Sequence, residues 1–118
     1  MKTPGPDHPI TVRPAGRAVR ILWRGREIGR TDAALVLKEA SYPEVFYVPR
    51  AAVDPAALER ATRTSFCPYK GEASYFTLVD GATRDEAAVW SYETPFPAME
   101  AIAGHLAFYP DKASVEPV

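Results

Sequence analysis

Hydrophobic and polar positions alternate with a period of two over most of the chain, which is the pattern of half-buried β-strands. From Ala18 onward, the large apolar residues Val19, Ile21 and Trp23 occupy every second position. The sequence RGRE then supplies a glycine-containing turn before Ile28. This segment is therefore predicted to form a β-hairpin.

Two further strands are predicted in the first half of the chain. Residues 34–39 (ALVLKE) place Leu35 and Leu37 on one face, and residues 44–50 (EVFYVPR) alternate in the same way. Because proline cannot donate a hydrogen bond to a neighbouring strand, Pro49 is expected to end the second strand or to lie at a sheet edge. An edge strand permits pairing between copies, so we expect a monomer or a homodimer.

A short helix is predicted after these strands. In residues 54–61 (DPAALERA), Asp54 is a good N-cap and Pro55 suits the first helical position. The residues that follow are good helix formers. We expect one or two turns of helix here.

A second hairpin is predicted in the middle of the chain. Residues 73–79 alternate, with Tyr75 and Phe76 on opposite faces, and they run into the dipeptide DG at 80–81. Because Asp-Gly is a strong hairpin-turn signal, a return strand is expected, and its best place is residues 87–92 (AAVWSY).

The clearest helical spacing lies in residues 94–110. Met99 and Ile102 are three positions apart, and Gly104 stands where a helix would end. A short last strand is predicted at residues 105–109.

The two ends of the chain have compositions that differ from the centre. Residues 1–17 are rich in proline and glycine and predict an extended arm, with brief pairing at 10–12. Residues 111–118 predict a polar, frayed tail. The chain is thus expected to hold one domain at residues 18–110, mainly β and built of compact antiparallel sheets. We expect seven or eight short strands and one or two short helices.

Composition excludes several classes of protein. The chain has 118 residues, a length that suits one domain. Its 14 Lys and Arg residues are balanced by 15 Asp and Glu residues. Without a basic excess to hold a phosphate backbone, we expect no nucleic-acid partner. No segment approaches the roughly 20 apolar residues of a membrane helix, and no signal-peptide core precedes the domain. We therefore expect no membrane partner and a cytoplasmic location.

The single cysteine limits the metal and redox chemistry of the chain. It permits no internal disulfide and no CxxC pair. Sulfur ligands are too few for the usual structural zinc site, although Cys67, His8 and His105 leave an unusual one open. We expect no metal and no other cofactor.

Five motifs, in order, resemble the bacterial family known as domain of unknown function 427. They are HPITVRPAGRAVRI, FYVPR, CPYKGEASYFTL, VWSYETPFP and IAGHLAFYP, and they extend from about His8 to Pro110. The resemblance covers nearly the whole chain. The activity of that family is not established, so the resemblance carries an expectation of fold more than of function.

The resemblance implies a β-tent fold, in which antiparallel sheets lean together over a shared core. Other β-tent domains often hold zinc through two CxxC pairs, and this sequence has neither pair. The family also carries a nucleotidyltransferase label. That chemistry needs carboxylates spaced to hold Mg²⁺. Asp85 and Glu86 would point to opposite faces of a strand, and no Gly-Ser loop precedes them, so nucleotidyl transfer is not expected.

The motif CPYKG, residues 67–71, holds the first candidate site residues. Cys67 is a candidate nucleophile if Lys70 folds back beside it, because a nearby cation favours the reactive thiolate. The alternative is that Cys67 is a small buried hydrophobic residue at a strand entry. Lys70 is likewise either a solvated turn residue or a ligand-binding cation.

Aromatic residues support a binding site at this turn. Tyr69 lies in the turn itself, and Tyr75, Trp90 and Tyr92 stand on what are predicted to be neighbouring strands. A cation beside aromatic rings is suited to small anionic or planar ligands. Trp90 is also compatible with a core position, whereas the hydroxyl of Tyr92 requires a polar partner.

Three more residues are candidates from other parts of the chain. Arg50 follows a strand exit and is either an anion clamp or a solvated arginine. His105 is either a proton shuttle or a cap on the preceding helix. Glu39 is either a surface residue or the carboxylate partner of Lys70 or His105.

Three functional hypotheses follow. The first is a module that binds a small polar or anionic ligand, with a pocket formed by Arg50, Tyr69, Lys70, Tyr92 and His105. The second is a small enzyme in which Cys67 or Lys70 does covalent chemistry while His105 or Glu39 transfers protons. The third is a protein-protein adaptor that uses exposed aromatic residues such as Phe96 and Phe108 as anchors.

Overall fold

The structure, a computed structural model, describes all residues, 1–118. It consists of ten strands and three short 3₁₀ turns. The strands are β1 (Ile10–Pro14), β2 (Val19–Trp23), β3 (Arg26–Thr31), β4 (Leu35–Glu39), β5 (Val45–Pro49), β6 (Leu58–Cys67), β7 (Gly71–Asp80), β8 (Thr83–Ser91), β9 (His105–Phe108) and β10 (Ala113–Pro117). The turns are η1 (Arg50–Ala52), η2 (Pro55–Ala57) and η3 (Pro97–Ile102). None of these turns is long or apolar enough to cross a membrane.

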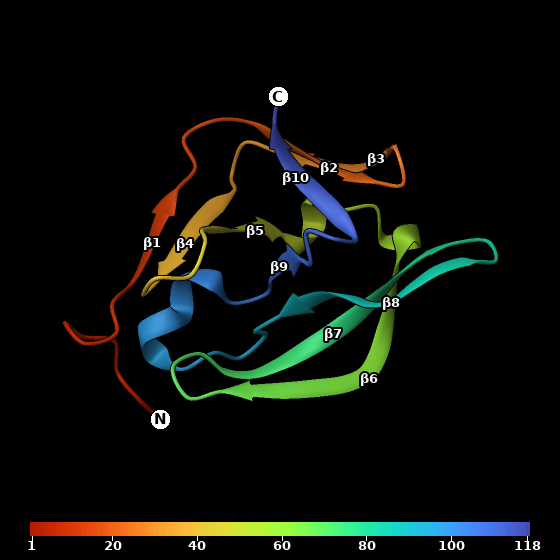
Figure 1. Cartoon of the computed structure of the whole chain (residues 1–118). Coiled ribbons are helices and arrows are strands. Elements are labelled where there is room, and N and C mark those ends of the chain that lie inside the picture. Colours follow the sequence, from red (N-terminus) through yellow and green to blue (C-terminus); the bar gives the residue numbers. More distant parts are fainter.

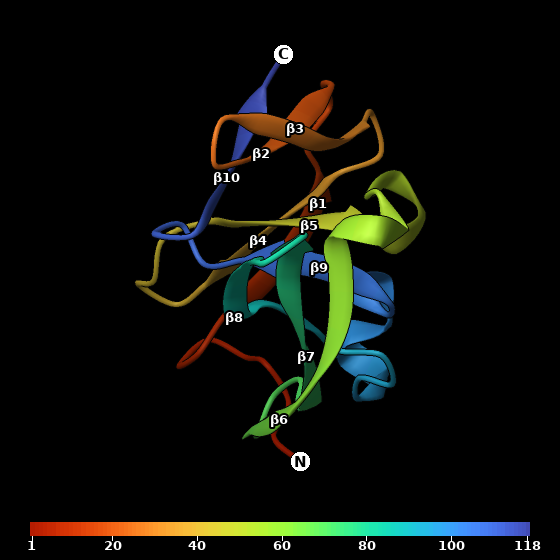
Figure 2. The same cartoon turned by 90° about the vertical axis from the view of Figure 1, so that its right-hand side faces the viewer.

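The strands form two antiparallel sheets. A seven-stranded sheet has the order β1-β4-β5-β9-β8-β7-β6, and a three-stranded sheet has the order β10-β2-β3. Figure 1 shows the small sheet above the large one, and the turned view in Figure 2 shows it as a separate layer at one end of the molecule. The prediction of a mainly β, β-tent-like fold is confirmed.

The two sheets share a hydrophobic core. From the small sheet, the alternating residues Val19, Ile21 and Trp23 are fully buried and pack with residues of the large sheet such as Phe76 and Leu106. Burying one such side chain contributes about 1.5–3 kcal/mol, so this cluster holds the sheets together.

The other face of the large sheet carries a second core. Leu37, Tyr47 and Tyr75 come from strands of the sheet, and Met99 and Ile102 come from η3. All five side chains are buried. The turn η3 therefore covers one end of this face, and the candidate functional site lies on the same face.

Strand β5 divides the large sheet. Its residues 45–47 pair with β4, whereas its pairing with β9 is limited to Val48 and Pro49. As predicted, the strand ends at Pro49. Because 45–47 have no strand partner on the β9 side, the large sheet is open between the first half of β5 and β9.

Both predicted hairpins are confirmed, with one change in length. Strands β2 and β3 pair directly, as do β7 and β8. Strand β8 begins at Thr83 rather than at Ala87, because the two-residue turn after Asp80 leads straight into paired strand. The first part of this strand was not predicted, because residues 84–86 are all charged and do not show the alternation of a half-buried strand.

The predicted helix at residues 54–61 is wrong beyond its first turn. Asp54 does act as an N-cap, accepting a hydrogen bond from the backbone N–H of Ala56 at 3.0 Å. The turn η2 then ends, and β6 begins at Leu58, which pairs with Leu78 of β7. Pairing along a ten-residue strand outweighs a local helix propensity of a few tenths of a kcal/mol per residue.

The helical segment predicted within 94–110 is a 3₁₀ turn, η3, rather than an α-helix. Gly104 follows it with a φ of 69°, a left-handed conformation that favours glycine. The strand predicted next is β9, but it is not the last strand of the chain.

The ends of the chain are more ordered than predicted. The expectation of a frayed C-terminal tail is wrong, because residues 113–117 form β10 and pair with β2. Val115 in this strand packs against the shared core. At the other end, pairing of the arm with β4 extends over residues 10–14, beyond the predicted 10–12.

Candidate functional site

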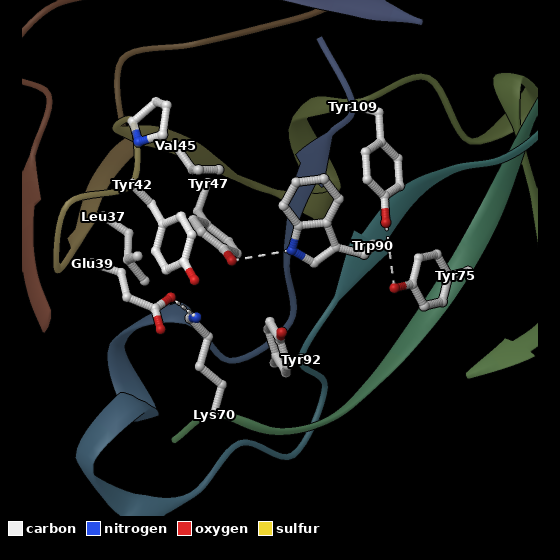
Figure 3. Close-up of a pocket in the computed structure, with 11 residues that line it drawn as sticks. Leu37, Glu39, Tyr42, Val45, Tyr47, Lys70, Tyr75, Trp90, Tyr92 and Tyr109 are labelled. Carbon is white, nitrogen blue, oxygen red and sulfur yellow. Dashed lines mark hydrogen bonds and ion pairs between the residues drawn. The ribbon is translucent and has the colours of Figure 1, made fainter. Parts of the chain in front are cut away.

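A cavity of about 400 Å³ opens on the second core face of the large sheet. Five of the six tyrosines of the chain line it. We call it the tyrosine cavity, and Figure 3 shows its walls. Its lining residues are Leu37, Glu39, Tyr42, Pro43, Val45, Tyr47, Lys70, Tyr75, Trp90, Tyr92 and Tyr109.

The strand period explains why these side chains meet. In a strand, residues two apart point to the same face, so Leu37 and Glu39 of β4 both face the cavity. Val45 and Tyr47 do the same from β5. Lys70 reaches the cavity from the turn between β6 and β7. The site is therefore assembled from segments that are distant in the sequence.

Hydrogen bonds hold the aromatic walls in place. The indole N–H of Trp90 donates to the hydroxyl of Tyr47 at 3.1 Å, and the two rings are nearly perpendicular at 88°. The hydroxyl of Tyr109 donates to that of Tyr75 at 3.5 Å, and Tyr75 also bonds to Ser65 at 2.8 Å. Fixed rings at different inclinations give the cavity a defined shape before any ligand arrives.

Lys70 and Glu39 form an ion pair in the cavity wall (Figure 3). Lys70 is only 6% exposed, and its Nζ donates to Oε1 of Glu39. The same Nζ lies 5.8 Å from the ring centroid of Tyr92, within cation–π range. His8 approaches the other oxygen of Glu39, with Nε2 at 2.7 Å from Oε2.

The charge state of Glu39 follows from these contacts. Burial opposes ionisation of this carboxyl group, but the hydrogen bonds from Lys70 and His8 outweigh burial, and the pKa of Glu39 is lowered. Glu39 is therefore a carboxylate at neutral pH. The cavity wall carries one negative and one positive group in contact.

The backbone of the turn before β7 directs Lys70 into the cavity. Gly71 has a φ of 107°, which a residue with a side chain rarely adopts. The carbonyl of Lys70 accepts a hydrogen bond from the backbone N–H of Phe96 at 3.0 Å. On its outer side, the turn is held by the N-terminal arm, because the N–H of Lys2 donates to the carbonyl of Pro68 at 2.7 Å.

Cys67 is half-buried beside Lys70. Its Sγ lies 3.9 Å from the Nζ of Lys70, and its side chain packs against the second core. It does not line the cavity. The contact between thiol and ammonium that the nucleophile hypothesis requires is therefore present, outside the cavity itself.

Tyr92 offers an unused polar group to the cavity. The residue is 8% exposed, and its hydroxyl makes no hydrogen bond with the protein. Burial raises the pKa of Tyr92, so the hydroxyl stays protonated and is available as a donor. Together with Lys70 and Glu39, Tyr92 gives the cavity a small set of polar groups among apolar walls.

Three residues predicted to contact a ligand lie outside the cavity. Tyr69 stacks on His8 of the arm, with centroids 4.1 Å apart. Arg50 lies over the ring of Phe76, which faces the shared core instead. His105 places Nδ1 at 3.1 Å from the carbonyl of Ala103, at the end of η3. Each makes a local contact, and none of the three lines the cavity.

Several cavity residues were not among the predicted site residues, namely Leu37, Tyr42, Pro43, Val45, Tyr47 and Tyr109. The strand parity of Tyr47 was visible in the sequence, but a tyrosine at such a position is equally suited to a core. The contact of His8 with Glu39 had no local signal, because 31 positions separate the two residues.

The aromatic residues considered as adaptor anchors are placed differently from each other. Phe108 is 6% exposed and belongs to the shared core, so the expectation that it is an exposed anchor is wrong. Phe96 is half-buried, and its ring meets edge-on that of Phe66, a residue that is 65% exposed, with centroids 6.0 Å apart.

A family model matches residues 11–118, and its description is domain of unknown function DUF427, NTP_transf_9. The chain belongs to this family. Membership of the DUF427 family confirms the resemblance carried by the five motifs. No curated protein matches the chain significantly.

The family name also refers to nucleotidyl transfer, a reaction that requires carboxylates placed together to hold Mg²⁺. The adjacent carboxylates Asp85 and Glu86 are not placed in this way. Asp85 accepts a hydrogen bond from the indole of Trp23 at 2.7 Å, and Glu86 accepts one from Thr77 at 3.0 Å. The two adjacent carboxylates are thus engaged by different partners. No group of three His, Cys, Asp or Glu side chains is placed to hold a metal ion.

Proposed function

We propose that the protein binds a small, flat, polar molecule in the tyrosine cavity. The observation that carries this proposal is the partly buried ion pair of Lys70 and Glu39 in a wall that is otherwise mostly aromatic. Small-molecule sites typically combine apolar walls with a few polar groups that fix the orientation of the ligand.

The size and lining of the cavity agree with such a ligand. Its volume of about 400 Å³ lies within the usual range of small-molecule sites, and eight of its eleven lining residues are hydrophobic. Aromatic walls stack well on a planar molecule. The walls are already fixed by hydrogen bonds such as that between Trp90 and Tyr47, so little ordering is needed on binding.

The charge of the wall favours a polar ligand over a strongly anionic one. Glu39 neutralises Lys70, so an anion would gain attraction from one group and repulsion from the other. A ligand that both donates and accepts, such as an aromatic amide, can bond to Glu39, Lys70 and the free hydroxyl of Tyr92 together.

A thermal-shift panel tests the proposal. It contains nucleosides, nicotinamide, hydroxybenzamides and simple carboxylates, with the wild-type protein and the Lys70→Met variant. A ligand at 100 times its dissociation constant stabilises by about 2.7 kcal/mol, which raises Tm by something on the order of 10 °C for a domain of this size. Lys70→Met should weaken a binder at least tenfold, because hydrogen bonds to charged groups contribute about 1.5–3 kcal/mol.

Arg50→Gln is the matched control, since Arg50 is a cation that lies outside the cavity. It should leave the shift of any binder unchanged. A flat panel, or a binder that Lys70→Met leaves untouched, would contradict the proposal.

Contact between Lys70 and Glu39 also favours a second candidate, an enzyme that uses the amine of Lys70 with Glu39 as proton carrier. The amine of Lys70 is already engaged by the carboxylate of Glu39 in the cavity wall, so binding is the better-supported function. An aromatic aldehyde with borohydride separates the two. Preferential reductive labelling of Lys70 over the exposed Lys112 would favour the enzyme, and equal or absent labelling would favour binding alone.

A further inference from the structure

A second cavity, of about 380 Å³, lies next to the tyrosine cavity. We call it the apolar cavity because seven of its eleven lining residues are hydrophobic and the Lys70–Glu39 ion pair is not part of its lining. The lining residues come from the segment before β5 and the start of β5, from β8, from the end of β9 and the segment after it, and from β10. The lining residues are Tyr42, Pro43, Glu44, Val45, Phe46, Trp90, Phe108, Pro110, Ala113, Ser114 and Val115.

The two cavities have four lining residues in common, Tyr42, Pro43, Val45 and Trp90. They meet where the large sheet is open, because residues 45–47 of β5 pair with β4 and not with β9. In a continuous sheet, strand pairing would separate the two faces at this point. Here the four shared residues border both cavities.

Three polar side chains of the apolar cavity, those of Glu44, Ser114 and Trp90, already have partners elsewhere in the protein. Glu44 accepts a hydrogen bond from Arg13 at 3.1 Å, and the hydroxyl of Ser114 donates to Glu116 at 3.1 Å. The indole N–H of Trp90 is directed to Tyr47 in the tyrosine cavity. What remains to meet a ligand is mainly hydrocarbon and aromatic surface, such as Val115 and Phe46.

We infer that the two cavities form one site for an amphipathic molecule, whose flat polar head lies in the tyrosine cavity and whose apolar tail lies in the apolar cavity. This inference rests on the proposed function and adds the class of ligand. The head bonds to the polar groups near Lys70, and the tail passes Trp90 to reach β10. A tail without polar atoms suits this cavity, because most of its lining is hydrocarbon and aromatic surface.

Alkyl esters of 4-hydroxybenzoic acid, from methyl to hexyl, are the probes, and 4-hydroxybenzamide represents the head alone. Binding is measured by isothermal titration calorimetry with the full chain. Burying one methylene contributes about 0.8 kcal/mol, so the Kd should fall roughly fourfold with each carbon until the cavity is filled.

The substitution Ser114→Phe places a ring in the apolar cavity and should abolish the dependence on tail length, while the Kd of 4-hydroxybenzamide stays as in the wild type. Ser114→Ala is the matched control and should preserve the dependence. Because a large residue in β10 can disturb folding, Val115→Asn serves as a second variant. It should weaken the hexyl ester and leave 4-hydroxybenzamide unchanged.

The outcomes separate this inference from the proposed function. Two results would overturn the amphipathic ligand and leave the proposed function standing. The first is a Kd that does not depend on tail length, and the second is a length dependence that survives both Ser114→Phe and Val115→Asn. Failure of the benzamide and of all the esters to bind overturns the shared site and counts against the proposed function as well.

Discussion

The ammonium of Lys70 donates a hydrogen bond to the carboxylate of Glu39 in the wall of an aromatic cavity, although 31 positions separate the two residues in the chain. Glu39 ends strand β4, and Lys70 stands in the turn between β6 and β7. The pair thus joins two distant parts of the large sheet. It also supplies the only charged groups of the tyrosine cavity.

The Lys70–Glu39 pair should show strong coupling in a double-mutant cycle. Each of Lys70→Met and Glu39→Leu leaves a partly buried charge without its partner, and each should cost roughly 1–3 kcal/mol of unfolding free energy. The double variant should cost clearly less than the sum, because it removes both charges. Urea denaturation measures the three changes, and simple additivity would contradict a direct interaction.

Glu93 should make the stability of the protein depend on pH in the acidic range. Hydrogen bonds from Arg60, and one from Ser74, lower the pKa of Glu93 from 4.5 to about 2. A lowered pKa means that the ionised carboxylate contributes stability above the unfolded-state value, and that this contribution is lost as the pH falls from about 4.5 toward 2.

The substitution Glu93→Gln should therefore reduce the loss of stability over this window, measured as urea midpoints at pH 5, 4, 3 and 2.5. Glu100→Gln is the control, since Glu100 is exposed and makes no ion pair. Identical acid profiles for the wild type and Glu93→Gln would contradict the assignment.

The hydrogen bond between Trp90 and Tyr47 should contribute measurably to stability. The substitution Tyr47→Phe removes the acceptor and leaves the partly buried indole N–H without its partner in the protein, at a cost of about 1–2 kcal/mol. Tyr42→Phe removes a hydroxyl from a residue that is 62% exposed, so it should change stability by less than about 0.5 kcal/mol. Equal effects of the two substitutions in denaturant unfolding would argue against the bond.

His8 should stabilise the protein through two separable contacts. Its ring stacks on Tyr69 with an interplanar angle of 9°, and its Nε2 bonds to Glu39. The substitution His8→Phe keeps an aromatic ring and loses the bond, whereas His8→Ala loses both. We expect His8→Ala to lower Tm more than His8→Phe does, and equal losses would show that stacking contributes nothing.

Much of the fold follows from local pattern, and the exceptions follow from distant pairing. The hairpins β2–β3 and β7–β8 were predictable, because period-two alternation and turn residues act within a short segment. The failed helix at 54–61 illustrates the limit, since pairing of β6 with β7 decides its structure. Likewise, β10 exists because β2 offers it a partner, which its polar sequence does not reveal.

The candidate site was predictable only in part for the same reason. Lys70, Tyr92 and Glu39 were singled out because a cation, a phenol and a carboxylate are chemically distinctive, and the structure brings these three together. Tyr42 and Tyr109 were missed, because a tyrosine suits a core or a surface as well as a site. The five tyrosines come together through the pairing of distant strands, and no local motif predicts that they line one cavity.

The central claim is that a ligand enters the tyrosine cavity, and the two tryptophan indoles of the chain report on it directly. Trp90 lines the cavity, whereas Trp23 is buried in the shared core and bonded to Asp85. In a ¹⁵N–¹H correlation spectrum, a hydroxybenzamide or another binder from the panel should shift the indole resonance of Trp90 and leave that of Trp23 in place. A binder that leaves the Trp90 resonance unmoved would contradict the account.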